Sequence, residues 1–377
     1  MKRWLGWLAV LALAMLGLSG CASQQVPQVS WPGLTVADGK VYAAATTHVL
    51  ALDAQNGTLL WQFPEEEKSK LGPFYATPVL VADEGLLIVA GFGDKTVYAL
   101  RVDGSKPTIA WQFPQTGTGN GGAKGQYVGA GTVAEGLFLI GNGDGHLYAL
   151  KVKDGTLAWS FATGDRVWAQ PLVQDGTVYV GSLDHFLYAL DLKSGNLLWK
   201  TRLNGAVATA PVLIGEHLWI GDFGHKISEI DPLSGEVLWS YQGDSWFWAH
   251  CAVQGEVLYA ADVKGTVYAL NTRTHELLWK TPEVVRTVRG ALVLDPEGQR
   301  LFVEDYELGE VRAMDPLTGQ VAAWRIRPQN PGRLPGDAVL AEGKLYTMPI
   351  MVTAKVQAFE LTNGTLAWQY PDVPSGQ

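Results

Sequence analysis

The sequence has little cysteine, little charge and no basic excess. Its 377 residues include only 2 Cys, which excludes a scaffold stapled by disulfides. Charged residues make up 17% of the chain and hydrophobic residues 47%, a balance that excludes intrinsic disorder. The net charge of −9 leaves no basic stripe for a phosphate backbone, so we expect no nucleic-acid partner.

The sequence also lacks helical periodicity and has an excess of tryptophan. No apolar 3.6-residue spacing is sustained after residue 21, so we expect almost no helix. The chain has 15 Trp and 44 Gly, and short β-branched and aromatic runs alternate with Gly and Asp turns. A regular excess of so large a side chain indicates a packing role that is repeated along the chain.

The N-terminal segment predicts a lipoprotein signal peptide. A positively charged start precedes an apolar run over residues 4–18, which is shorter than the roughly 20 residues of a transmembrane helix. The run ends at Leu18-Ser19-Gly20-Cys21, which resembles the lipobox of bacterial lipoproteins; a plain secretory signal is the alternative. We expect residues 1–20 to be removed, Cys21 to be lipidated and residues 21–29 to form a polar tether.

Such a lipid predicts an extracytoplasmic, membrane-anchored protein. Each buried methylene contributes about 0.8 kcal/mol, so several acyl chains anchor stably. No Asp follows Cys21, which in a Gram-negative bacterium indicates the periplasmic face of the outer membrane. In a single-membrane bacterium the same lipid would hold the protein on the outer face of the cytoplasmic membrane. Removing Lys2 and Arg3 with the signal changes the net charge from −9 to −11.

One phrase, Ala-Leu-Asp-x-x-x-Gly-x-x-x-Trp in its clearest form, recurs eight times. Segments 51–61 and 189–199 carry it in full, and the other copies vary it. The Trp residues that close the copies lie 40 to 50 positions apart, at Trp61, Trp111, Trp159, Trp199, Trp239, Trp279, Trp324 and Trp368. A period of this length is the signature of a repeat architecture.

Each repeat contains four short strand patterns separated by turn residues. The fourth repeat shows them at 170–174, 177–181, 186–190 and 196–200. In the first repeat, residues 31–34 form the first such pattern. Eight antiparallel units of this kind predict an all-β fold, an eight-bladed β-propeller over residues 30–372. Each blade is expected to be one continuous segment, with ring closure by packing of blades one and eight; an exchanged strand is the alternative.

The repeated phrase resembles the tryptophan-docking motif of the PQQ-type propellers, the quinoprotein alcohol dehydrogenases and their non-enzymatic relatives. The resemblance implies that each closing Trp stacks on a Gly turn of a neighbouring blade. The glycines that would accept them are Gly57, Gly155, Gly195, Gly235, Gly319 and Gly364. His275 replaces this Gly in the sixth repeat and Asp103-Gly104 is displaced in the second, so docking is expected to be imperfect there. No Trp-Asp dipeptide occurs, which argues against WD40 repeats.

The residues that define quinoprotein dehydrogenases are not matched. Those enzymes resemble one another in an adjacent Cys pair, a Ca²⁺ held by Glu and Asn, and an Asp base, whereas Cys251 is the only cysteine after Cys21. No His, Cys and carboxylate cluster has metal-ligand spacing, and the Gly-rich segment 116–123 lacks a P-loop lysine. We therefore expect no enzyme, no metal and no cofactor. The alternative is a PQQ-dependent or quinone-linked dehydrogenase, with PQQ and Ca²⁺, or a ligand-sensing propeller.

A lipid-anchored propeller without that catalytic set is similar to the BamB-type lipoproteins of outer-membrane β-barrel assembly. The resemblance is one of architecture, repeat and lipobox. It implies a scaffold in the bacterial cell envelope that binds envelope proteins through its loops, as a monomer within a complex. Fold analogy alone carries this implication, because no partner-binding residue is matched.

The segments before the first strands contain the candidate binding residues, since the first strand is the innermost of each blade. Aromatic and basic residues there are typical of recognition hot spots. The candidates are Tyr75, Arg166, Trp168, Gln170, Trp246, Trp248, His250, Arg286, Arg289 and Arg333. They would hold a partner protein or an anionic or aromatic ligand. The alternative is that they fill the channel and hydrogen-bond one another.

Two further sets of residues have structural explanations. Cys251 beside His250 could suggest a redox or metal pair, but a lone buried cysteine is favoured as a packing residue. His146, His185 and His225 fall in successive turns and are expected on one rim as solvated residues.

Overall fold

The structure is a computed structural model, and part of the chain is described. The described residues are 33–66, 69–115, 122–328, 332–353 and 355–372. The chain divides into two units, Met1–Ser30 and Trp31–Gln377. The predicted signal peptide, Cys21 and the tether lie outside the described residues. Within those residues, no helix has the length and apolar character needed to cross a membrane.

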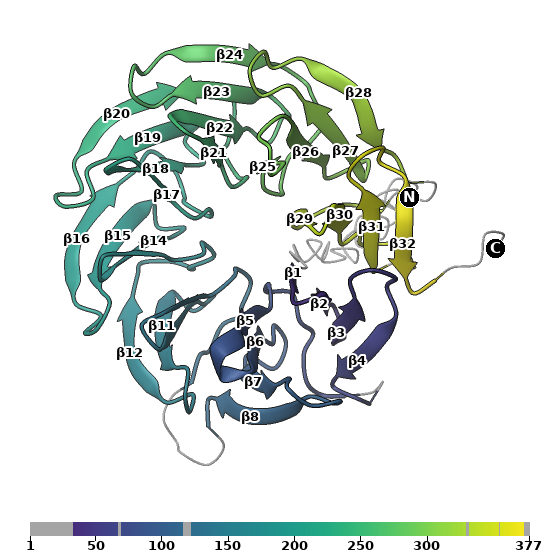
Figure 1. Cartoon of the computed structure of the whole chain (residues 1–377). Coiled ribbons are helices and arrows are strands. Elements are labelled where there is room, and N and C mark those ends of the chain that lie inside the picture. The colour runs from purple at the N-terminus through teal and green to yellow at the C-terminus, as the bar shows by residue number, and fades with distance from the viewer. Residues whose placement is uncertain (1–32, 67–68, 116–121, 329–331, 354, 373–377) are drawn as a thin grey trace, which may run out of the picture. The chain divides into compact units, whose positions relative to one another are not determined.

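The described part of the second unit forms eight four-stranded antiparallel sheets, each built from four consecutive strands. Figure 1 shows them as blades around a central channel, with the first strand of each blade innermost and the fourth outermost. The predicted eight-bladed propeller is thus confirmed. Apart from strands, the described residues contain one 3-10 helix, η1 (Ala82–Glu84), in agreement with the expected lack of helix.

The strands of blades one to four are β1 (Leu34–Ala37), β2 (Lys40–Ala45), β3 (His48–Asp53), β4 (Leu59–Phe63), β5 (Val79–Val81), β6 (Leu86–Ala90), β7 (Val97–Arg101), β8 (Thr108–Phe113), β9 (Thr132–Ala134), β10 (Leu137–Gly141), β11 (His146–Lys151), β12 (Leu157–Ala162), β13 (Leu172–Gln174), β14 (Thr177–Gly181), β15 (Phe186–Asp191) and β16 (Leu197–Arg202). The strands of blades five to eight are β17 (Val212–Ile214), β18 (His217–Gly221), β19 (Lys226–Ile230), β20 (Val237–Gln242), β21 (Ala252–Gln254), β22 (Val257–Ala261), β23 (Val267–Asn271), β24 (Leu277–Thr281), β25 (Val293–Leu294), β26 (Leu301–Asp305), β27 (Glu310–Met314), β28 (Val321–Ile326), β29 (Val339–Ala341), β30 (Lys344–Thr347), β31 (Val356–Glu360) and β32 (Leu366–Tyr370).

The first strand of blade one corrects the sequence prediction. It was expected at residues 31–34, but β1 begins at Leu34. Gly33 connects two blades instead: its carbonyl accepts the Ala44 N–H at 2.9 Å, and its N–H donates to the Tyr75 carbonyl of the next connection at 3.1 Å. A Cβ on Gly33 would lie 2.0 Å from the Thr77 hydroxyl, so the backbones approach too closely here for any residue but glycine.

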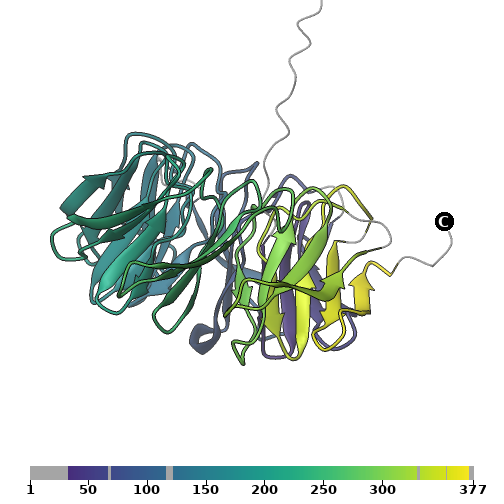
Figure 2. The same ribbon diagram turned by 90° about the horizontal axis from the view of Figure 1, so that it is seen from above.

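Connections alternate between the two faces of the ring, because neighbouring strands are antiparallel. In Figure 2 the strands run between these two faces. Connections that follow second and fourth strands share one face, which we call the pocket face. Connections that follow first and third strands, including the turns of the repeated phrase, share the opposite face.

The closing tryptophans dock on the following blade. Trp159 lies against the turn of blade four, where a Cβ added to Gly195 would stand 2.6 Å from the indole ring. The indole Nε1 donates to the Leu192 carbonyl at 2.9 Å. The same ring contact and hydrogen bond join Trp111 to Gly155, Trp199 to Gly235, Trp279 to Gly319 and Trp368 to Gly57. Trp324 lies on Gly364 without a hydrogen-bond partner for its indole N–H in the described structure. Because these glycines also have φ near +70°, a larger residue there would be strained as well as obstructed.

The Asp of the repeated phrase builds the turn that presents this glycine. The Asp231 carboxylate accepts the backbone N–H groups of Leu233 and Ser234 at 2.7 and 2.9 Å, and its carbonyl accepts the Gly235 N–H at 2.8 Å. The hydrogen bonds from Ser234 and then Leu233 lower the pKa of Asp231. Such side-chain turns are a property of Asp and Asn, which explains the Ala-Leu-Asp-x-x-x-Gly pattern.

Blade six uses a different platform. The His275 imidazole stacks on Trp239 with ring centroids 4.6 Å apart and planes 8° from parallel. Its Nε2 contacts the buried Glu229 carboxylate at 2.7 Å, and the other Glu229 oxygen pairs with His217 Nδ1 at 2.8 Å. The expectation of imperfect docking therefore does not describe this blade, because a flat, hydrogen-bonded ring takes the place of the bare backbone.

Blade two does depart from the pattern. A Cβ on Gly104 would meet nothing closer than the Lys106 carbonyl at 3.7 Å, so no ring lies on this turn. Trp61 packs instead into an apolar cluster with Leu87, Leu100 and Val102 of blade two.

Ring closure follows the prediction. Leu34, Val41 and Leu50 of blade one share an apolar cluster with Tyr346 and Trp368 of blade eight. The Ala54 carbonyl accepts hydrogen bonds from the Tyr346 hydroxyl at 3.1 Å and from Trp368 Nε1 at 3.0 Å. No strand is exchanged between the blades in the described chain, so the alternative is excluded.

Replacing a docking tryptophan is expected to destabilise the ring much more than replacing an exposed one. Trp159→Ala removes a ring that is 8% exposed and should lower the free energy of unfolding by about 3–5 kcal/mol. Trp246→Ala, at a ring that is 46% exposed, should lower it by less than about 1 kcal/mol. Urea unfolding followed by circular dichroism measures both. Equal losses would contradict the docking account.

Candidate functional site

A pocket opens at the channel mouth on the pocket face, and every blade contributes to it. Its lining comes from the connections that enter the eight first strands. The lining residues are Gly33, Thr77, Val128, Gly129, Ala130, Trp168, Gln170, Ala208, Trp248, His250, Arg289, Gly336 and Asp337. Five of the ten predicted residues are among them: Trp168, Gln170, Trp248, His250 and Arg289. The aligned sequence positions before the first strands thus do converge in space.

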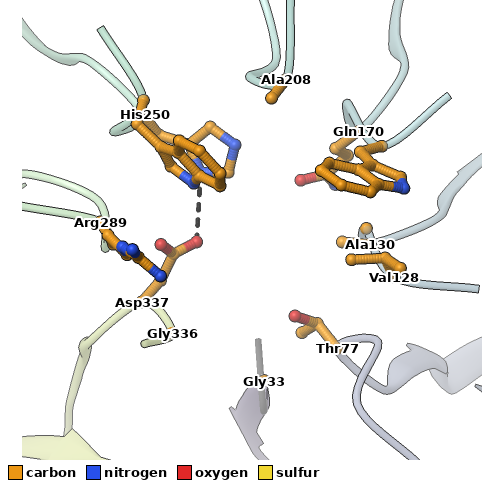
Figure 3. Close-up of a pocket in the computed structure, with 13 residues that line it drawn as sticks. Gly33, Thr77, Val128, Ala130, Gln170, Ala208, His250, Arg289, Gly336 and Asp337 are labelled. Atoms are coloured by element: carbon orange, nitrogen blue, oxygen red, sulfur yellow. Dashed lines mark hydrogen bonds and ion pairs between the residues drawn. The ribbon is translucent and has the colours of Figure 1, made fainter. Parts of the chain in front are cut away.

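The pocket has a charged wall and an apolar wall. Figure 3 shows His250, Arg289 and Asp337 together on one side, and Val128 and Ala130 on the other. These walls come from blades six to eight and from blade three, respectively. A ligand or side chain that enters the channel mouth therefore meets charge on one side and hydrocarbon on the other.

His250 and Asp337 form the ion pair of the charged wall. His250 Nδ1 lies 3.1 Å from Asp337 Oδ2, and the other Asp337 oxygen accepts the Ala291 N–H at 2.7 Å. Burial opposes both charges, but the facing opposite charge outweighs it, so the pKa of His250 is raised and the pKa of Asp337 is lowered. The side chains remain 32% and 44% exposed, so solvent screens the pair.

Glu304 on β26 lies near this pair and was not predicted. Its side chain is 2% exposed, and Oε2 accepts the Ala338 N–H at 3.0 Å. Burial first, and then the nearby Asp337 charge, raise the pKa of Glu304 well above its ordinary value. A carboxyl within the apolar strand Leu301–Asp305 was the sequence signal that could have identified it.

A second feature extends from the pocket across the pocket face. We call it the aromatic–arginine row, and its members in order of contact are Trp246, Phe223, Trp248, Arg289, Tyr306 and Arg333. Phe223 stacks on Trp246 and on Trp248, with centroids 5.6 and 4.9 Å apart and planes within 20° of parallel. The Arg289 guanidinium lies 5.5 Å from the Trp248 ring and 4.1 Å from the Tyr306 ring. Arg333 lies 5.5 Å from Tyr306.

The other predicted residues lie outside both features. Tyr75 packs edge-on against Phe92, with centroids 5.1 Å apart. Arg166 lies 5.8 Å from the Trp168 ring. Arg286 contributes its backbone N–H to the Asp305 carboxylate at 2.9 Å.

Phe223 and Tyr306 were missed because their segments were read only as turns. Phe223 follows Asp222, the first residue after β18, and Tyr306 follows Asp305, the last residue of β26. Both rings therefore lie in a turn that leads to a third strand. Second-strand turns share the pocket face with the connections before first strands. Aligning both sets of positions across the repeats would have brought the two rings to Trp248 and Arg289.

Cys251 and the turn histidines take structural positions. Burial raises the pKa of the Cys251 thiol to about 12, and it packs beside an apolar cluster that includes Trp219. Within the described part of the chain, no three His, Cys, Asp or Glu side chains are grouped to hold a metal. His185 and His225 lie in second-strand turns and His146 begins β11 directly after such a turn, and all three are half-buried rather than fully solvated.

The ion pair predicts a pH-dependent contribution to stability. It is present between about pH 4, the unfolded pKa of Asp, and about pH 6.5, that of His. It is lost as pH rises through the raised pKa of His250, or falls through the lowered pKa of Asp337. Asp337→Asn should therefore lower the free energy of unfolding by about 0.5–1 kcal/mol at pH 5.5 and by less at pH 8.5. Urea unfolding at the two values measures this difference.

Glu256→Gln is the matched control, since Glu256 pairs with Arg273, whose charge is constant over this range. The effect of this control should not differ between pH 5.5 and 8.5. A larger effect of Asp337→Asn at pH 8.5 than at pH 5.5 would show that the pair does not titrate as described.

Comparisons with known proteins agree with this architecture. The crystal structure of BamB from Moraxella catarrhalis superposes with a TM-score of 0.66 at 18% identity, over 84% of this chain and 90% of that one. The computationally designed Ika8 protein superposes with a TM-score of 0.70 at 16% identity, over 87% and 96%. At these identities the likeness is one of fold. Among curated proteins, no sequence matches significantly.

The match to a family model shows the family to which this chain belongs. The model described as outer membrane protein assembly factor BamB matches residues 20–122, 107–245 and 243–375. These three matches together span every blade of the propeller and all of the candidate residues. The chain therefore belongs to the family of the outer membrane protein assembly factor BamB.

Proposed function

We propose that this protein is a non-enzymatic, lipid-anchored scaffold that binds other envelope proteins during outer-membrane protein assembly. The match of the BamB family model along residues 20–375 is the observation that carries the proposal. The fold of BamB from Moraxella catarrhalis supports it, since it covers 84% of this chain.

The architecture suits a scaffold. The docked tryptophans and the apolar clusters between blades hold the strands in one ring, so the connections on the pocket face are presented from a rigid frame. Trp, Tyr and Arg side chains are concentrated on that face, and these residue types dominate the energetics of protein interfaces. Rigid presentation reduces the entropy that is lost when a partner binds.

The channel mouth does not fit a PQQ and Ca²⁺ centre. Asp337 is the only carboxylate that lines the pocket, and His250 and the Ala291 N–H already occupy its oxygens. Neither Glu nor Asn is among the lining residues, and no adjacent Cys pair occurs in the sequence. The pocket volume of about 70 Å³ is also far below the roughly 300 Å³ or more of cofactor sites. These observations support the scaffold over the dehydrogenase.

The anchor is the second part of the proposal. Cys21 follows an apolar segment and a Leu-Ser-Gly sequence, as in bacterial lipobox motifs. A lipid on this cysteine would keep the propeller at the membrane where its partners act.

Partner capture tests the scaffold directly. Cells that express the affinity-tagged full chain are crosslinked, and the complexes purified from membranes are identified by mass spectrometry. We expect subunits of the outer-membrane β-barrel assembly machinery to be enriched over a strain that expresses the tag alone. Cys21→Ser should release the protein from the membrane fraction and reduce this enrichment.

Two outcomes would contradict the proposal. Recovery of no envelope protein above the tag control would remove the scaffold function. Incubation of the pure protein with PQQ and Ca²⁺ provides the other: a stoichiometric complex that survives gel filtration, or dye-linked alcohol oxidation, would favour the dehydrogenase.

A further inference from the structure

We infer that the aromatic–arginine row is a docking site for an acidic, aromatic segment of a partner protein. The inference rests on the proposed scaffold function and adds the surface and the chemistry of the partner. Five separate connections in blades five to eight contribute its six side chains, so the site depends on the ring and belongs to no single loop.

The stacking of Arg289 leaves its hydrogen-bond donors available. The central carbon of its planar guanidinium lies 5.5 Å from the centroid of the Trp248 ring and 4.1 Å from the centroid of the Tyr306 ring. The N–H groups of a guanidinium point outward in that plane, where a carboxylate binds in bidentate geometry. Within the described chain, neither Arg289 nor Arg333 forms an ion pair or a side-chain hydrogen bond.

Another stacked arginine, Arg300, shows how the donors of a structural arginine are paired within this protein. Arg300 lies over the Phe302 ring at 5.4 Å and the Trp324 ring at 5.8 Å. Its Nε donates to Asp295 at 2.9 Å and its Nη1 to the Leu361 carbonyl at 2.7 Å. A chain with 37 acidic and 28 basic residues has ample carboxylates for such pairs. Arg289 and Arg333 are stacked neighbours that form no such ion pair among the described residues, which indicates that a partner protein supplies the carboxylates.

The other end of the row is apolar. Trp246 is 46% exposed, and its ring lies 16° from parallel with Phe223, which in turn stacks on Trp248. Three rings in one stack make a rigid platform that loses little side-chain entropy when a ligand binds. The exposed part of this platform suits an aromatic or large aliphatic side chain.

A chain segment fits the site better than a bilayer does. Arg289 lines the pocket at the channel mouth, and both Arg289 and Arg333 are half-buried. A ligand must therefore reach into the mouth to meet the donors of Arg289, which an extended peptide can do and a flat lipid surface cannot. The partner segment then carries carboxylates spaced beside an aromatic side chain, and binding should weaken with salt.

Three labelled peptides test the inference by fluorescence anisotropy with the full chain. They are Gly-Glu-Trp-Glu-Phe-Glu-Gly, the same peptide with Gln for each Glu, and the same peptide with Gly for each aromatic residue. We expect the first to bind and each of the other two to bind at least about tenfold more weakly. Vesicles of phosphatidylcholine with phosphatidylglycerol are the parallel probe, and we expect no row-dependent binding to them.

Variants locate the binding on the row. Arg289→Gln and Arg333→Gln should each weaken binding of the acidic aromatic peptide by about tenfold, without a change in melting temperature. Arg289→Lys keeps the charge but loses the planar stack, and should give a smaller loss. Arg202→Gln is the matched control, because Arg202 also lies over a ring, Phe186 at 6.0 Å, on the outermost strand β16. It should leave binding within about twofold of the unchanged protein.

Three binding results would overturn the inference, and so would one result of partner capture. The first is no binding of the acidic aromatic peptide at millimolar concentration, and the second is equal binding to Arg289→Gln and Arg202→Gln. The third is row-dependent binding to the vesicles alone, which would assign the row to a lipid surface. Partner capture by the full chain that survives both Arg289→Gln and Arg333→Gln would leave the scaffold function intact and remove only this site.

Discussion

The structure depends on one contact, a tryptophan ring laid on the turn of the next blade. The indole needs a flat surface without a Cβ, and the Asp-x-x-x-Gly turn supplies it, with a carbonyl placed to accept the indole N–H. This contact recurs at six of the eight junctions between blades; at one of the others the His275 ring takes the place of the glycine, and at the last Trp61 packs in an apolar cluster. Trp368 on the Gly57 turn closes the circle, so blade one and blade eight are joined by this same contact.

The fold could be predicted because this contact requires particular residues at a nearly constant spacing in the sequence. The turn must present a glycine, and the tryptophan must follow it at a nearly constant distance, so the pattern is easily recognised in each repeat. The number of blades therefore follows from the eight closing tryptophans. The prediction of imperfect docking was wrong where another residue provides the surface on which the tryptophan ring lies. His275 is an example: its ring, held by Glu229, takes over the role of the glycine, and no rule about glycine could foresee that.

The candidate site was only partly predictable. Positions before the first strands converge by the geometry of a propeller, which is why Trp168, Trp248 and His250 were found to line one pocket. Phe223 and Tyr306 belong to another set of turns, and their contact with Trp248 and Arg289 depends on how side chains lean across the face. Glu304 is an isolated acid in an apolar strand, and only its burial distinguishes it from an ordinary surface carboxylate. Asp337 is distinguished only by its contact with His250, which the sequence does not show.

We propose that the blades form a rigid frame and that the side chains of the pocket face recognise the partner. Photo-crosslinking in living cells tests this most directly, with a benzophenone amino acid at Trp246 of the row or at Leu198, which is 55% exposed on the outermost strand β16. The account predicts that position 246 crosslinks to an envelope protein at a segment with acidic and aromatic residues, and that position 198 does not. Equal adducts from the two positions, or adducts at position 246 to phospholipid alone, would contradict it.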